Sequence, residues 1–331
     1  MTFNNKNVFV TGGAGFIGST LVRELLKEKA NVLVYDNFLI GDNSNLDEVK
    51  SQIKVIRGDI LDSNLKETFV KNEVDYVFNL AAEPYIPHCY DRPTRFFEIN
   101  ANGALNVLLA SKAANVKRII QYSSSEVYGS AKQVPMDENH VTLPLSTYAV
   151  SKLAADRLCF TLYHEQKIPV VILRQFNVYG PRETQPYIIP EIITQLNKSN
   201  RLHLGNITAR RDFTYVQDAA RGAIELMKLK EAEGQVFNMG TGIDHSIEEI
   251  AKCIGGIMGH DKIEITVDKN RLRPLDVQLL QCNNSKMRQL TGWEPKVSFM
   301  EGLKLTVDHF RESGCRWLWE TKIKEEEKLW K

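Results

Sequence analysis

Two short stretches of the sequence contain side chains that could transfer protons. In "STYAVSK", Tyr148 and Lys152 are four residues apart on a predicted helix, so both project from one face. An ammonium close to a phenol favours the phenolate, which predicts a tyrosine pKa lowered from its ordinary value toward neutrality. Such a tyrosine can take the proton of a substrate hydroxyl while the carbon that bears it gives up a hydride. In "QYSSSEVYG", Ser124 ends a predicted strand and could share that hydroxyl's hydrogen bond, and Glu126 follows it.

The N-terminal stretch "VFVTGGAGFIGS" predicts a dinucleotide site that could accept the hydride. Gly12, Gly15 and Gly18 lie between a predicted strand and a predicted helix, so the backbone can turn tightly and a pyrophosphate can rest on the helix N-terminus. Asp36 ends the second predicted strand, where a carboxylate can bind the ribose 2′-hydroxyl and repel a 2′-phosphate. Asn37 follows, with no adjacent Arg. The pattern favours NAD over NADP.

Further cofactor contacts are expected where other predicted strands end. Asp59 closes the third strand and could reach the adenine edge, or could be a solvated strand end. The residues expected to contact the cofactor are Gly12, Gly15, Phe16, Ile17, Gly18, Asp36, Asn37, Asp59, Ile60, Leu80, Ala81, Ala82, Tyr148 and Lys152.

These groups require a scaffold of alternating strands and helices, and the sequence predicts one. The strand patterns are "NVFVTG", "NVLVYD", "IKVIRGDI", "DYVFNLAA", "VKRIIQYSSS" and "IPVVILRQFN", separated by helical patterns. This alternation predicts an α/β fold with a Rossmann-type doubly wound parallel sheet and a smaller C-terminal α/β substrate domain. We expect residues 1–176, with 214–239 returning, to form the NAD-binding domain, and residues 177–213 and 240–331 to bind substrate.

Other segments give narrower predictions. Ser246 and Glu249 form a capping-box pattern at the start of a predicted helix. The helical patterns at 92–114 and 147–167 are apolar on more than one face, which predicts burial in a homodimer. The tail "WLWETKIKEEEKLWK" is predicted to form an exposed terminal helix.

Composition excludes several classes of protein. The 331 residues include 42 Lys and Arg against 41 Asp and Glu, so no basic excess favours nucleic acid or anionic membranes. No apolar run approaches the roughly 18 residues of a membrane span. The first strand begins within a few residues, so we expect no signal peptide. The five cysteines are scattered, with no close pair to suggest a metal site or redox motif, which predicts reduced thiols and a cytoplasmic location.

The motifs together resemble a known family. "TGGAGFIGS", "NLAAE", "SSSEVYG", "YAVSK", "NVYGPR", "RRDFTYVQD" and "RPLD" occur in the order found in extended short-chain dehydrogenase/reductases, in the NAD-dependent nucleotide-sugar epimerase/dehydratase family. The resemblance covers nearly the whole chain. It implies tightly held NAD that is recycled in each turnover, and a dimer made through paired helices.

The resemblance also implies roles for individual residues. Ser124, Tyr148 and Lys152 match the family's catalytic triad. The residues expected to contact substrate are Glu83, Ser124, Ser125, Asn177, Arg211 and Arg273, of which the last three match positions that hold the diphosphate. Guanidinium groups suit phosphate oxygens. By the same resemblance, "ETQPYIIPEII" is expected to line the nucleotide pocket. UDP and dTDP sugars are the first expected substrates, followed by GDP and CDP sugars.

Glu126 bears on which reaction the chain performs. Epimerases of this family usually carry small or neutral residues in the two positions after the catalytic hydroxyl. Hexose 4,6-dehydratases carry Asp-Glu there, or in some relatives a neutral residue and Glu, which Ser125-Glu126 resembles. Once C4 of the sugar is a ketone, a buried Glu126 could remove the C5 proton and assist loss of the C6 hydroxyl. Dehydration is therefore the favoured prediction and 4-epimerisation is the alternative.

Other reactions remain open on the sequence. Ser125 replaces an aspartate that helps water depart in the best-known dehydratases, which keeps a 5,6-elimination open. Sugar-acid decarboxylases of the family share the glutamate, although "YAVSK" differs from the residues that they usually have around the tyrosine. A non-catalytic NAD-sensing regulator is expected to lose the Tyr–Lys pair, which is intact here, and a simple reductase would change the nicotinamide stoichiometrically.

Overall fold

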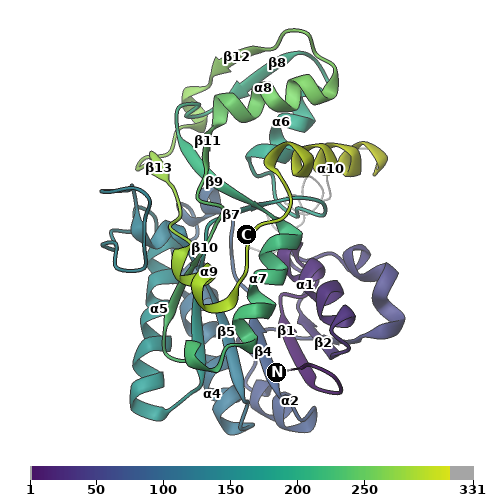
Figure 1. Ribbon diagram of the computed structural model, residues 1–331, viewed down its shortest axis with the longest axis vertical. Coiled ribbons are helices and arrows are strands. Elements are labelled where there is room, and N and C mark those ends of the chain that lie inside the picture. Colours follow the sequence, from purple (N-terminus) through teal and green to yellow (C-terminus); the bar gives the residue numbers. More distant parts are fainter. Residues whose placement is uncertain (1, 314–331) are drawn as a thin grey trace.

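The molecule is built around a parallel sheet with helices on both faces, and a smaller lobe covers one end of it (Figure 1). The structure is a computed structural model that describes residues 2–313. The predicted C-terminal helix lies outside the described residues. Among residues 2–313, no helix has the length and apolar character needed to cross a bilayer.

The sheet has seven parallel strands in the order β10-β6-β5-β4-β1-β2-β3. Because successive strands add outward from β1 in both directions, the order reverses between β1 and β4, and crevices at such a switch point bind ligands. The fold is Rossmann-like, as the sequence predicts. The strands are β1 Asn7–Thr11, β2 Asn31–Asp36, β3 Lys54–Arg57, β4 Tyr76–Asn79, β5 Arg118–Ser124, β6 Val170–Gln175 and β10 Val236–Met239.

Alternate residues of each strand enter two apolar layers, because side chains of a strand alternate between faces. Val8 and Val10 pack with Leu21 of α1 on one face, whereas Phe9 packs with Phe69 and other residues on the opposite face. The first face is covered by α1 Phe16–Lys27 and α7 Val216–Lys228; the second is covered by α2 Leu65–Lys71, α4 Ala104–Ala113 and α5 Thr147–Gln166.

The smaller lobe has its own sheets and helices. Strands β7 Asn177–Tyr179, β9 Arg210–Tyr215, β11 Asp244–Ser246 and β13 Leu279–Leu280 form one sheet, and β8 Arg201–Leu204 pairs with β12 Glu264–Val267. The helices of this lobe are α6 Ile188–Leu196, α8 Ile247–Met258 and α10 Phe299–Glu312. The predicted capping box at Ser246 and Glu249 is confirmed at the start of α8.

Short helical segments account for the remaining helices among residues 2–313. They are α3 Pro93–Phe97, the π-helical segment Glu98–Gly103, α9 Ser285–Thr291 and the 3-10 turns η1 Asn43–Gln52, η2 Ile86–Cys89, η4 Ser125–Tyr128, η5 Lys230–Ala232 and η6 Lys269–Arg271. Segment 214–239 contributes α7 and β10 to the larger unit. Met287 and Trp293 also pack into the apolar layer that contains α7, although the sequence assigns them to the smaller domain. The exact division into domains stays a prediction.

Candidate active site

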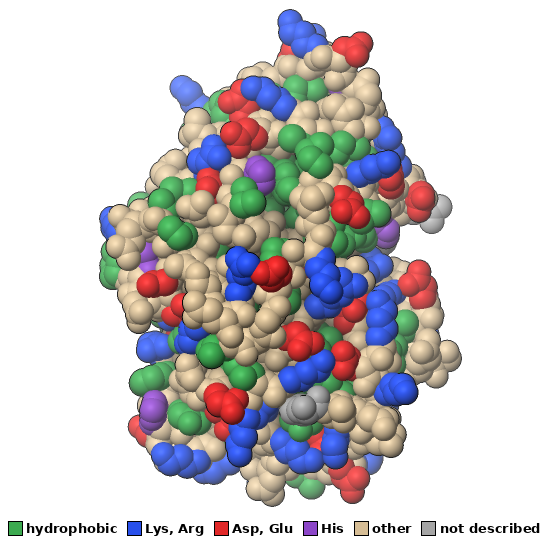
Figure 2. Space-filling view, in the orientation of Figure 1, with side chains coloured by type: hydrophobic (Ala, Val, Ile, Leu, Met, Phe, Trp, Pro, Cys, Tyr) green, Lys and Arg blue, Asp and Glu red, His purple; other side chains and the backbone are tan. Residues whose placement is uncertain are grey.

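A cavity of about 890 Å³ lies where the C-terminal ends of the sheet strands meet the smaller lobe. Its lining comes from β2, β5 and β6, from the residues that directly follow β1 and β4, and from α6, β9 and the segment 270–276. Acidic and basic side chains intersperse over the face of the molecule in Figure 2, with no broad region of one sign. The cavity therefore stands out by its position at the strand ends and by the residues that line it.

The glycine turn at the start of α1 forms one end of this cavity. Gly12 has φ +66°, and a Cβ there would lie 2.9 Å from the backbone nitrogen of Ala81. A Cβ on Gly18 would lie 2.2 Å from the Gly12 carbonyl oxygen. Gly15 caps α1 with no side-chain hydrogen bond, and the first turn of α1 contains no acidic residue. The uncapped helix N-terminus can accept an anionic group, so these residues fit a dinucleotide pyrophosphate.

The strand ends beside the turn carry the two predicted carboxylates. Asp36 is 6% exposed, and its carboxylate accepts hydrogen bonds from the backbone N–H groups of Ala14 at 2.9 Å and Phe38 at 2.8 Å. Asp59 accepts a hydrogen bond from the Asn37 side chain at 2.8 Å. These bonds brace the ends of β2 and β3 against the glycine turn. All fourteen residues expected to contact the cofactor line the cavity.

The Tyr–Lys pair lies on the first turns of α5. The helix begins at Thr147, where the Ser146 hydroxyl caps it by accepting a hydrogen bond from the Ala149 N–H at 3.1 Å. Lys152 is 5% exposed, and its ammonium donates a 2.6 Å hydrogen bond to the Tyr122 carbonyl on β5. Burial lowers the pKa of Lys152 to about 8 because the charged form loses hydration.

The predicted lowering of the tyrosine pKa is wrong for this structure. Burial raises the pKa of Tyr148 to about 12, and the nearby Glu126 carboxylate acts in the same direction. A hydrogen bond with Ser124 opposes both effects. The physical reason is that the phenolate would lose its hydration, while the Lys152 ammonium directs its hydrogen bond to a backbone carbonyl.

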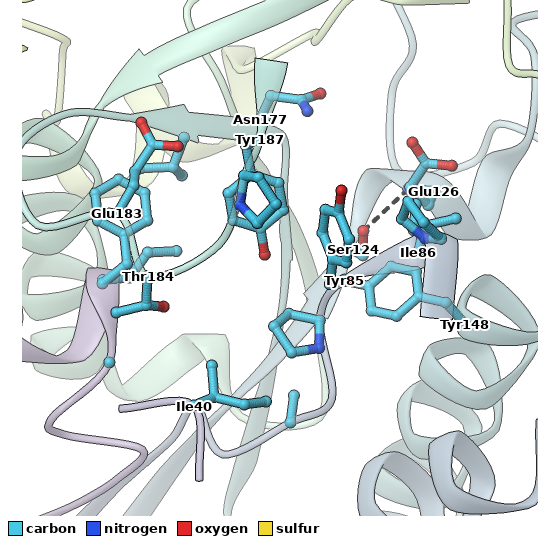
Figure 3. Close-up of a pocket in the computed structure, with 18 of the residues that line it drawn as sticks. Ile40, Tyr85, Ile86, Ser124, Glu126, Tyr148, Asn177, Glu183, Thr184 and Tyr187 are labelled. Atoms are coloured by element: carbon cyan, nitrogen blue, oxygen red, sulfur yellow. Dashed lines mark hydrogen bonds between the residues drawn. The ribbon is translucent and has the colours of Figure 1, made fainter. Parts of the chain in front are cut away.

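The catalytic candidates Ser124 and Glu126 are held by the end of β5. The Ser124 hydroxyl accepts a 3.2 Å hydrogen bond from the Glu126 N–H, which turns the chain from the strand into η4 (Figure 3). Glu126 is 9% exposed and lines the cavity with Ser125. Ser124, Glu126 and Tyr148 lie together on one side of the cavity in Figure 3, although they come from three different elements.

The predicted diphosphate residues also line the cavity. Arg211 lies on β9 and is 7% exposed, and burial lowers its pKa while Glu126 opposes that shift. Its guanidinium lies 3.7 Å from the Asp276 carboxylate. Arg273 and Asn177, the first residue of β7, line the cavity with it. Sequence reasoning missed Asp276, although the "RPLD" motif contains it.

Glu83 is the one predicted site residue that does not line the cavity. It is 3% exposed, and its carboxylate accepts a 2.7 Å hydrogen bond from Arg95, which does line the cavity. The Glu83 N–H donates to the Asn100 side chain at 2.8 Å. A buried carboxylate requires an ionic or hydrogen-bonding partner, and here Arg95 supplies it. Glu83 therefore lies behind Arg95, and its contact with substrate stays a prediction.

An aromatic wall lies between the two groups of polar residues. The rings of Tyr85 and Tyr187 meet edge to face with centroids 5.9 Å apart, and both line the cavity. The expected contribution of "ETQPYIIPEII" agrees with the lining positions of Glu183 and Tyr187. Glu183 is 5% exposed, accepts a hydrogen bond from the Gly180 N–H, and has a pKa raised by burial. Nothing in the residue pattern around Tyr85 indicated its place.

Comparisons with known proteins add to this geometry. The family model described as GDP-mannose 4,6 dehydratase matches residues 9–306. A human dTDP-D-glucose 4,6-dehydratase is 31% identical, covering 94% of this chain and 92% of its own. A UDP-N-acetyl-alpha-D-glucosaminuronate decarboxylase of Bacillus cytotoxicus is 34% identical, covering 93% of this chain and 98% of its own. The structure of a Thermus thermophilus UDP-glucose 4-epimerase in complex with NAD superposes with TM-score 0.84 and 30% identity, covering 92% and 99% of the two chains.

The chain belongs to the extended short-chain dehydrogenase/reductases that act as nucleotide-sugar epimerases and dehydratases. The family resemblance seen in the motifs is confirmed. The three relatives above are named for three different reactions, a dehydration, a decarboxylation and an epimerisation. The choice among these reactions for this chain therefore depends on the residues beside Tyr148.

Proposed function

We propose that this chain is an NAD-dependent nucleotide-sugar dehydratase of the hexose 4,6 type. The observation that carries the proposal is the place of Glu126, a buried carboxyl that lines the cavity beside Ser124 and Tyr148. A proton-transfer group at this point is required to remove the C5 proton and is not required to epimerise C4. The named dehydratase relatives and the family model agree with this assignment.

NAD fits the end of the cavity formed by the glycine turn. The N-terminus of α1 would hold the pyrophosphate, and Asp36 would bind the adenosine ribose, as the geometry of the turn allows. When bound, NAD supplies a hydride acceptor for the oxidation of C4 and a hydride donor for the reduction at C6.

The side chains of the site provide the proton transfers. Because burial raises the pKa of Tyr148, the phenol must first give up its own proton, and the Lys152 ammonium would favour the phenolate that results. The phenolate then takes the C4 hydroxyl proton while Ser124 holds that hydroxyl by a hydrogen bond. Glu126 then takes the C5 proton and delivers it to the departing C6 hydroxyl, which leaves as water. The proton that finally returns to C5 balances the one that Tyr148 accepted. The net reaction is the loss of one water, with C4 oxidised and C6 reduced.

Lys152, Arg211 and Arg273 support these steps. The Lys152 ammonium donates its hydrogen bond to the Tyr122 carbonyl, one helical turn from Tyr148. From there its charge would offset part of the effect of burial on the phenolate during proton transfer. Arg211 and Arg273 face the cavity and would bind the diphosphate of the substrate. UDP and dTDP sugars are the first proposed substrates, because curated relatives are named for them.

The test of this function is a reaction panel followed by mass spectrometry. Purified protein with NAD is incubated with UDP, dTDP, GDP and CDP hexoses. The products are separated by chromatography and their masses are measured. Loss of one water supports the proposal, whereas an unchanged mass with a new retention time or loss of carbon dioxide contradicts it. Glu126→Gln is expected to abolish water loss while transient nicotinamide reduction remains. If that variant loses water at the parental rate, the role of Glu126 is wrong.

A 4-epimerase is the second candidate, and two observations favour it. Ser125 is neutral, so the site holds one acid at the two positions where many dehydratases have two. Glu126 also lies close enough to Arg211 to influence its pKa, as a carboxylate that only partners a guanidinium would. In that case Glu126→Gln would leave turnover of the substrate largely intact. The reaction panel distinguishes the two candidates through the mass of the product.

We also propose a homodimer formed through α4 and α5. Leu109 of α4 is 43% exposed, and Val150 and Phe160 of α5 are each 41% exposed, so apolar side chains face outward from both helices. Exposed apolar groups of this size on neighbouring helices are typical of an interface. Light scattering should report a dimer for the parent and a smaller mass for Phe160→Glu. A cytoplasmic location stays a prediction.

A further inference from the structure

A buried ion pair lies directly behind the catalytic candidates. Arg174 of β6 is 4% exposed and Asp156 of α5 is fully buried, and the Arg174 Nε donates a 2.8 Å hydrogen bond to the Asp156 carboxylate. Neither residue lines the cavity. A buried pair contributes little net stability, because desolvation offsets the attraction, but its hydrogen bonds require a defined geometry. The pair is therefore suited to fixing the positions of the residues that it contacts.

This pair contacts the catalytic segment of β5 and η4 on both sides. Before Ser124, the Ser123 hydroxyl donates to the Asp156 carboxylate at 3.3 Å. After Glu126, Arg174 donates to the Tyr128 hydroxyl oxygen at 3.0 Å and lies 4.8 Å from the centre of its ring. The segment that carries the two catalytic candidates is thus held at both of its ends by one ion pair.

Tyr128 is also fixed from the neighbouring strand. Its hydroxyl donates a 2.7 Å hydrogen bond to the side chain of Asn238 on β10, and Tyr128 itself is fully buried. The Asn238 amide in turn donates to the Met136 carbonyl at 3.0 Å. The Tyr128 hydroxyl therefore accepts one hydrogen bond and donates one, and both partners belong to sheet strands of the rigid core.

The ion pair joins this segment to the catalytic helix. Asp156 follows Lys152 by four residues and Tyr148 by eight, so the three side chains lie along one face of α5. The Asp156–Arg174 pair therefore connects the helix that carries Tyr148 to the turn that carries Glu126. A shift of about 1 Å between such groups can lower a reaction rate about a hundredfold.

We propose that Tyr128, held by Arg174 and Asn238, is a positioning residue for Glu126. This inference rests on the proposed function, because it concerns the step that Glu126 performs. The Ser123 contact holds the Ser124 end of the segment, and the Tyr128 contacts hold the Glu126 end. Loss of the Tyr128 hydroxyl should therefore disturb the elimination and leave the oxidation of C4 nearly unchanged.

The experiment compares Tyr128→Phe with the parent in single-turnover reactions on a sugar that the parent dehydrates. Nicotinamide absorbance reports C4 oxidation, and mass spectrometry reports water loss. We expect water loss to slow tenfold to about a hundredfold, with oxidation changed less than about threefold. Tyr76→Phe is the matched control, because Tyr76 is buried at the N-terminal end of β4, away from the cavity, and loses the same hydroxyl.

Two results would overturn the positioning role. The first is an equal slowing of both steps in Tyr128→Phe, which a general loss of structure produces. The second is a parental rate for both steps. Glu126→Gln is measured in parallel: if it retains water loss, the proposed function fails and this role fails with it. If Glu126→Gln is inactive in elimination and Tyr128→Phe is normal, only the positioning role is wrong.

Discussion

The buried ammonium of Lys152 should make the protein less stable at neutral pH than it would be without that charge. The pKa of Lys152 falls from 10.5 to about 8 on folding, because burial penalises the charged form. At about 1.4 kcal/mol per pH unit, this difference corresponds to a cost of about 3 kcal/mol at pH 7. The folded state holds the proton less tightly than the unfolded chain does, so the cost is complete below pH 8.

The sign of the pH dependence follows from the same difference. Between the folded pKa of about 8 and the unfolded value of 10.5, the unfolded chain binds more protons, so stability rises with pH in this window. About 2 kcal/mol of the cost should be relieved between pH 7 and pH 9.5. Lys152→Met has no such proton, so its free energy of unfolding should lack this contribution.

The assay is equilibrium urea unfolding of the parent and Lys152→Met, without added nucleotide, at several values from pH 7 to pH 9.5. The unfolding free energy of the parent should rise by about 2 kcal/mol relative to that of Lys152→Met between pH 7 and pH 9.5. Lys304→Met is the matched control, since it removes the same charge at an exposed position on α10. A constant difference for Lys152→Met would refute the reasoning that this ammonium is buried and charged.

Three further predictions follow from the site. Tyr148→Phe should abolish every nucleotide-sugar reaction of the chain, measured by product mass, and a fully active variant would remove the shared chemistry. Glu83→Gln should lower the free energy of unfolding by about 2–3 kcal/mol, because Arg95 loses its carboxylate partner, yet leave KM within about twofold; a large rise in KM would support a substrate role for Glu83. Asp276→Asn should raise KM about fivefold at unchanged kcat if Asp276 orients Arg211 toward the diphosphate, as proposed, and an unchanged KM would contradict that role.

The cofactor end of the site was largely predictable because its requirements are local. Gly12 has a positive φ, and a Cβ on Gly18 would occupy the space of the Gly12 carbonyl oxygen, six residues earlier in the chain. The helical spacing of Tyr148 and Lys152 likewise follows from the period of α5. Such features depend on residues close in sequence, so the pattern of residues indicated them.

The substrate end was less predictable because its contacts join distant segments. Tyr85 and Tyr187 meet across 102 positions of the chain, and Arg174 contacts Asp156 and Tyr128 from a different strand. No local pattern indicates which of several polar residues will be paired with each other. Asp276 lies inside a motif that was recognised, yet its proximity to Arg211 required the fold.

The sequence by itself determined the family, the parallel sheet, the dinucleotide turn and the side chains available for proton transfer. The tertiary structure decided which of those side chains reach the cavity, placing Glu126 beside it and Glu83 behind Arg95. It also decided the direction of the Tyr148 pKa, because burial is a property of the whole packed chain. Residue type and spacing specify what a group can do, whereas desolvation and pairing depend on neighbours that only folding brings together.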